Sequence, residues 1–91
     1  MALGGFPHGW TLGGQAQVQA HVLVSLDPIV DAMGVLRHAL VLQTVTLDAV
    51  GIGEALVTVP SGLAGITFHS QMITLRDGLK VSGVLDTEIV F

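Results

Sequence analysis

The chain has 91 residues, enough for one domain, and its composition is 51% hydrophobic but only 11% charged, with a formal charge of −4. Soluble domains carry about a quarter charged residues, so we expect part of the apolar surface to meet another protein. No apolar run reaches the roughly 18 residues of a membrane-spanning helix, and three fixed cations form no basic patch, which excludes a membrane span and a nucleic-acid partner.

Residues 1–9 form the first predicted segment, an N-terminal leader that lacks the basic start and apolar core of a signal peptide. Residues 10–91 follow as a single domain, in which short runs of valine, threonine, isoleucine and leucine are separated by glycine. This pattern is typical of strands. The sequence therefore predicts an all-β fold, a small antiparallel β-sandwich, with strands at about 10–25, 35–47, 54–59, 65–75 and 79–91, the first and last split by a bend.

The first predicted strand contains an unbroken alternation of polar and apolar residues over positions 15–22. Its apolar members should face the core, and its outward row consists of Gln15, Gln17, Gln19 and His21. Amides avoid the large desolvation cost of a charge when another surface covers them, and no lysine or proline protects this strand as an edge. The row is therefore a candidate interface, with Gln17 and Gln19 expected between subunits or between sheets; an ordinary solvent face is the alternative.

The stretch from Pro28 to Met33 fits either a helix of one or two turns or a plain loop between strands. Asp27 could cap such a helix, Pro28 suits the first helical position, and Gly34 could end it. Turn-forming residues also separate the later strands, at positions 48–53, 60–62 and 76–78.

Alternating positions on the predicted strands identify the side chains expected in the core. These are Val18, Val22, Leu40, Leu42, Val57, Ile66, Phe68, Met72, Leu85 and Ile89.

A weak internal repeat suggests two similar halves. Three residues of the first half recur 52 positions later, and each set precedes a turn and another strand-like run: Gly13, Gln19 and Leu23 correspond to Gly65, Gln71 and Leu75. Chance matching among small and apolar residues is the alternative.

The second half resembles a known kind of module. Residues 59–77 read VPSGLAGITFHSQMITLRD and residues 78–85 read GLKVSGVL. About the last 33 residues are similar to β-rich modules at the C-terminal ends of secreted bacterial multidomain proteins, with Gly65, Gln71, Leu75 and Ser82 at matching positions and Gly83 in place of the usual asparagine. The resemblance implies a β-sandwich and an extracellular or cell-surface setting, and it carries no activity.

Few residues are suited to catalysis or metal binding. The chain has no cysteine, and its four histidines lack the short ligand spacing of a zinc site. The acidic residues lie mostly in or beside predicted turns, and neither a glycine-flanked serine elbow nor a phosphate-binding loop occurs. We therefore expect no enzyme, no catalytic residue, no cofactor and no metal.

The low charge and the amide row favour a non-enzymatic structural or interaction subunit, either a homo-oligomer or a member of a larger protein assembly. The alternative is a small carbohydrate-binding module, with Trp10 and Gln71 as the ligand-binding residues. The chain holds one tryptophan and no tyrosine, and this shortage of aromatic platforms favours the first hypothesis over the second.

Overall fold

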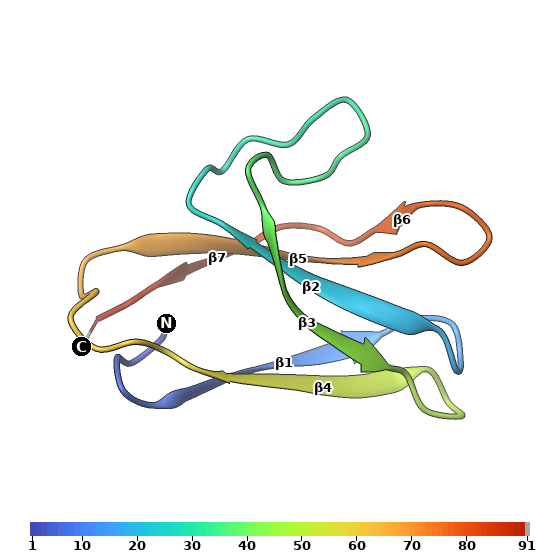
Figure 1. Ribbon diagram of the computed structural model, residues 1–91, viewed down its shortest axis with the longest axis horizontal. Coiled ribbons are helices and arrows are strands. Elements are labelled where there is room, and N and C mark those ends of the chain that lie inside the picture. Colours follow the sequence, from blue (N-terminus) through green and yellow to red (C-terminus); the bar gives the residue numbers. More distant parts are fainter. Residues whose placement is uncertain (91) are drawn as a thin grey trace.

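A computed structural model describes residues 1–90 and shows two antiparallel sheets that pack on each other (Figure 1). The all-β sandwich prediction is confirmed, because residues 1–90 contain strands and loops but no helix, and so none that could span a membrane. The stretch at 28–33 is a loop. The strands are β1 (Pro7–Gly13), β2 (Gln19–Ser25), β3 (Leu40–Thr46), β4 (Ile52–Thr58), β5 (Thr67–Thr74), β6 (Lys80–Val81) and β7 (Leu85–Glu88).

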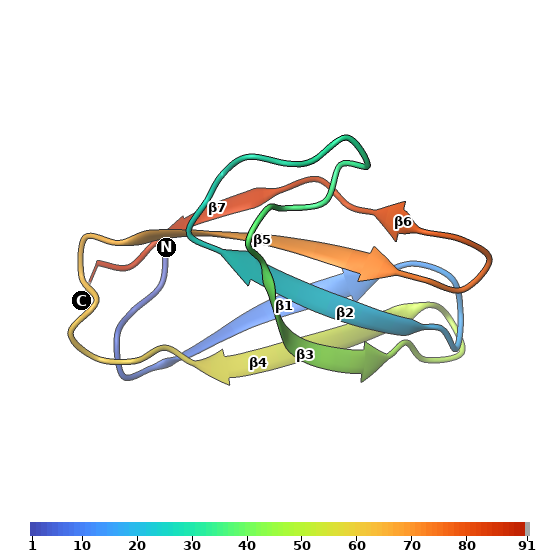
Figure 2. The ribbon, with the colours of Figure 1, turned by 45° about the horizontal axis from the view of Figure 1, so that its top comes forward.

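The two sheets differ in width. β1 pairs only with β4, whereas the larger sheet has the order β3-β2-β5-β6, and β7 also pairs with β5. β6 and β7 pair with successive parts of β5, opposite the edge that β2 occupies, so they act as one strand interrupted between them. Two strands therefore face a sheet that is four strands wide (Figure 2).

The connectivity divides the chain into two similar halves. In each half a first strand joins the small sheet and the next strands join the large sheet: β1, β2 and β3 in one half, and β4, β5 and β6–β7 in the other. Equivalent strands begin at Pro7 and Ile52, at Gln19 and Thr67, and at Leu40 and Leu85, which are 45, 48 and 45 positions apart. The sequence repeat at 52 positions is therefore not the structural correspondence.

The core between the sheets consists of two clusters. The larger contains Leu12, Ala20, Val22, Leu47 and Ala55, and the smaller contains Ala2, Val59 and Ile89. Ala2 is buried and bridges to Ile89, and β1 begins at Pro7. The segment 1–9 is therefore packed into the fold, and the predicted boundary of the leader differs from the structure.

The core prediction is confirmed for Val18, Val22 and Ile89, and Val57, Phe68 and Met72 are partly buried.

Four residues predicted for the core are exposed instead. Leu40, Leu42, Ile66 and Leu85 expose 73%, 39%, 37% and 61% of their surface. For β3, the face on which the side chains lie was predicted correctly, because Leu40 and Leu42 line a groove between the sheets. The burial was wrong because a two-stranded sheet is too narrow to cover the inner face of the wider one.

Candidate interaction site

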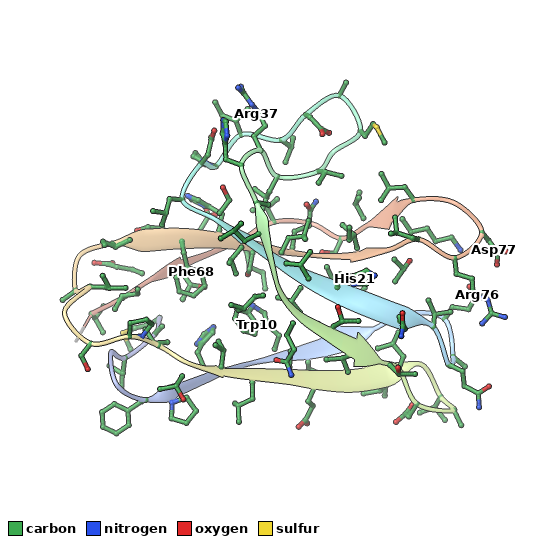
Figure 3. The ribbon with its side chains drawn as sticks, viewed as in Figure 1. Trp10, His21, Arg37, Phe68, Arg76 and Asp77 are labelled. Carbon is green, nitrogen blue, oxygen red and sulfur yellow. The ribbon has the colours of Figure 1, made fainter. Side chains whose placement is uncertain are left out.

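An apolar groove of about 750 Å³ lies between the two sheets on the side where β3 and β4 are edge strands. Its walls are mostly aliphatic and aromatic, and among residues 1–90 only Asp27 and His38 line it with ionisable side chains. Figure 3 shows Trp10 and Phe68 pointing into the space between the sheets. A volume of this size falls in the range of binding pockets, so the groove is the leading candidate site.

The groove opens because β3 and β4 diverge. The turn between them holds the two strands together as far as the middle of each strand, where the Leu56 backbone N–H donates to Oε1 of Gln43 at 3.0 Å. Beyond that point the strands separate (Figures 1 and 2). We call the opening between them the seam; its rims are Leu40 and Leu42 on β3 and Val57 and Thr58 on β4.

A β-bulge in β3 shapes the seam. Val22 of β2 pairs with Gln43, whereas the next residue, Leu23, pairs with Val41, so Leu42 is an extra residue on β3. A bulge of this kind interrupts the alternation of faces. Consequently, Leu42 lines the groove while its neighbour Gln43 also reaches inward to β4.

Both rims of the seam are open sheet edges. Within residues 1–90, β3 pairs only with β2 and β4 only with β1. On β4, the N–H of Leu56 points toward β3 and the N–H of Val59 points the other way, to the carbonyl of Phe6. Because backbone direction alternates along a strand, the N–H and C=O of Thr58 face the seam, where they are available to an added strand.

An aromatic cluster forms the inner end of the groove. The rings of His8 and Phe68 meet edge to face at 5.8 Å, and the ring of Trp10 lies 4.9 Å from that of His8 and 6.4 Å from that of Phe68. The Trp10 indole N–H donates to Oγ of Ser70 at 3.0 Å. Trp10, predicted as a possible sugar platform, is thus part of the packing between the sheets.

Burial within this cluster lowers the pKa of His8 below 6.5, with a smaller effect from the N-terminal amine. The unfolded chain therefore binds this proton at a higher pH than the folded chain. The contribution of neutral His8 to the free energy of unfolding is fully present above about pH 6.5, and it is lost as the pH falls through the lower pKa of the folded chain.

We expect the free energy of unfolding, measured by denaturant titration, to decrease between about pH 7 and pH 5 in part through His8. The variant His8→Gln should show a smaller decrease. Equal pH dependence in the wild type and His8→Gln would contradict this role of His8.

The opposite face of the large sheet is covered by a loop, residues 26–39, that leads from β2 to β3. Gln71 of β5 is only 4% exposed and holds this loop. Its amide nitrogen donates to the carbonyls of Gly34 at 2.6 Å and Ser82 at 3.0 Å, and its oxygen accepts from the Leu36 N–H at 3.0 Å. Gln71 therefore has a structural role, and its amide offers no free group to a sugar.

Three polar side chains lie in a row across β2, β5 and β7, because Ser25 pairs with His69 and His69 pairs with Asp86. Nδ1 of His69 lies 2.7 Å from Oδ1 of Asp86. However, the Ser25 hydroxyl donates to the carbonyl of Arg37 at 2.6 Å and accepts from the N–H of Asp27. Since its proton is directed at a backbone carbonyl, Ser25 anchors the two ends of the loop and is not poised as a nucleophile.

The predicted amide row is not a single strand. β1 ends at Gly13 and β2 begins at Gln19, so Gln15 and Gln17 lie in the connecting turn, and Gln17 has a positive φ of 61°. All three glutamines of the row are exposed, so none lies between the sheets. His21 contacts Oγ1 of Thr44 on β3 at 2.8 Å. The row and the groove are on different faces, and a subunit contact through these residues stays a prediction.

The seam was not predicted as a site. A signal for it exists in the sequence, since Ala39–Leu47 is apolar or uncharged without interruption, but that signal also fits a buried strand. Within residues 1–90 no group of three or more histidine, aspartate or glutamate side chains could hold a metal ion. Comparison with known proteins found no match to any family model, any curated protein or any solved structure.

Proposed function

We propose that this protein is an interaction subunit, without catalytic activity of its own, that binds an extended segment of another polypeptide in the seam. The observation that carries the proposal is the seam itself: two open strand edges that diverge across an apolar groove. An added strand would form backbone hydrogen bonds along β3 or β4 and place alternate side chains in the groove, which is the geometry of β-strand addition.

The composition of the surface supports this function. Eighteen large hydrophobic residues of the described chain are exposed, and those at the seam form a continuous lining instead of lying singly. Of the residues that the structure describes, a polar ligand would meet two ionisable groups in the groove, Asp27 and His38. The site therefore favours an uncharged, apolar segment over a charged one.

Carbohydrate binding is the weaker alternative. Trp10 packs against His8 and Phe68, and its indole N–H is bonded to Ser70. Gln71 lies on β5 with all its hydrogen-bonding groups occupied. Sugar sites combine an exposed aromatic ring with free polar groups, and no observation favours that combination at these residues.

Replacing both Leu40 and Leu42 by lysine should abolish binding in the seam while the isolated domain stays folded. Both side chains are already partly exposed, but a bound strand would cover the two new charges, and burial of an unpaired charge is costly. The measurements are assembly mass by light scattering at micromolar concentration and binding of a fluorescent peptide of alternating valine and threonine. We expect at least about a tenfold loss of affinity, or 1.4 kcal/mol.

Val50→Lys is the matched control. Val50 is also a large exposed aliphatic residue, but it lies in the turn between β3 and β4 and not in the groove. This variant should associate and bind peptide as the wild type does. The proposal fails if the wild-type protein neither associates nor binds the peptide, or if the double-lysine variant behaves like Val50→Lys.

A further inference from the structure

We infer that the segment bound at the seam is β3 of a second copy of this chain, paired antiparallel with β3 about a two-fold axis at Val41. This inference rests on the proposed function and names its partner. In a two-fold contact the same surface is used by both copies, so it must be complementary to itself. Three properties of β3 meet this condition.

The first property is the absence of charge and proline at the edge. Natural edge strands are blocked by charged residues, proline, bulges or short length, and of these β3 has only the bulge at Leu42. The other edges of the fold carry such residues: Pro7 begins β1, β4 contains Glu54, β6 contains Lys80, and β7 contains Asp86 and Glu88. β3, with the sequence LVLQTVT, contains no charge and no proline.

The second property is the arrangement of charge around the strand. Arg37 precedes β3 and Asp48 follows it, with no lysine, arginine or carboxylate between them, and His38 lies 3.9 Å from the carboxylate of Asp27. Antiparallel pairing of two copies directs Arg37 of each strand toward Asp48 of the other. Like charges do not meet at the axis, and opposite charges approach at both ends, which favours the antiparallel arrangement.

The third property is the position of the apolar side chains. An axis perpendicular to the sheet keeps the inner faces of both copies on the same side, so Leu40 and Leu42 of each copy lie beside the open groove of the other. These two residues are exposed in the single chain. Pairing would thus cover the apolar surface that the narrow β1–β4 sheet leaves open.

A single cysteine placed on β3 tests this pairing directly, because the native chain contains none. Val41 is suitable, since it is 58% exposed and does not line the groove. On the two-fold axis, its Cα would lie opposite the Cα of its copy, within disulfide range. The Val41→Cys protein should therefore form a disulfide-linked dimer under mild oxidation about a hundredfold faster than Val50→Cys, the exposed control, because pairing raises the effective thiol concentration.

The outcomes separate this inference from the function on which it rests. A wild-type dimer with fast cross-linking at position 41 supports the pairing of two β3 strands. A wild-type assembly that the double-lysine variant dissociates, but whose position 41 cross-links no faster than position 50, overturns that pairing and leaves the seam as an interface. A wild-type monomer that binds the valine-threonine peptide overturns the second copy as partner and supports the proposed function. A monomer that binds no peptide overturns both.

Discussion

Replacing Phe68 by alanine is expected to lower the free energy of unfolding by about 3 kcal/mol, in the lower part of the range for buried phenylalanine. Phe68 is only partly buried, but it packs against the smaller core cluster of Ala2, Val59 and Ile89. Its ring also meets His8 and Trp10 edge to face, and such aromatic pairs add stability beyond the area that they bury. Alanine would remove all of these contacts and enlarge the groove.

Denaturant titration followed by Trp10 fluorescence would measure this change. Leu75→Ala is the control, because Leu75 is a large aliphatic residue that is 59% exposed just beyond β5, and its effect should stay within about 0.5 kcal/mol. Equal midpoints for Phe68→Ala and the wild type would mean that the inward face of β5 is assigned incorrectly.

Replacing Gln71 by leucine should cost a similar amount, about 3 kcal/mol, for a different reason. The substitution keeps an apolar stem of comparable size but leaves the N–H of Leu36 and the carbonyls of Gly34 and Ser82 without their partner. A buried group that loses its hydrogen bond costs about 1–3 kcal/mol. Because two of the three groups belong to the loop at 26–39, that loop should also loosen from the sheet.

Amide hydrogen exchange gives the specific readout for Gln71→Leu, since the Leu36 amide should lose protection more than amides in β2. Gln43→Leu is a matched control on another strand. Gln43 forms one hydrogen bond, to an exposed backbone N–H, and its loss should cost only about 0.5–1.5 kcal/mol. If the two variants were equally stable, the three bonds of Gln71 would not hold the loop.

Strand positions could be predicted from the sequence because alternation reports which face a side chain occupies. Leu40 and Leu42 were placed correctly on the inward face of their strand. Alternation, however, does not report how many strands lie opposite that face. Burial requires a covering layer, and the width of the β1–β4 sheet depends on long-range pairing, which no local pattern contains.

The glutamine row shows a second limit. Perfect alternation from Gln15 to Val22 predicted one strand, but the chain must cross from the small sheet to the large one between Gly13 and Gln19. Gln17 adopts a left-handed backbone conformation there, which is uncommon for a residue other than glycine, asparagine or aspartate. The requirement to change sheets overrides the local preference of the segment for strand.

The role of Gln71 could be predicted only in part from the sequence. Its position on a strand was predicted, and it matched the module that the second half resembles, but its function depends on a loop 35 residues earlier in the chain. Amide side chains donate and accept at once, which suits them to hold backbone loops as well as to line interfaces. The sequence alone does not distinguish the two uses.

The pairing of β1 with β4 has a consequence for how the chain reaches this fold. The register joins Pro7 to Thr58 and Gly13 to Ile52, and the bridge between Ala2 and Ile89 spans nearly the whole chain. Closing such large loops costs entropy before any contact compensates for it, and domains dominated by distant pairings fold in milliseconds to seconds. On the ribosome, β1 emerges before β4 and must wait for it, so the small sheet assembles late and β1 stays without its partner until then.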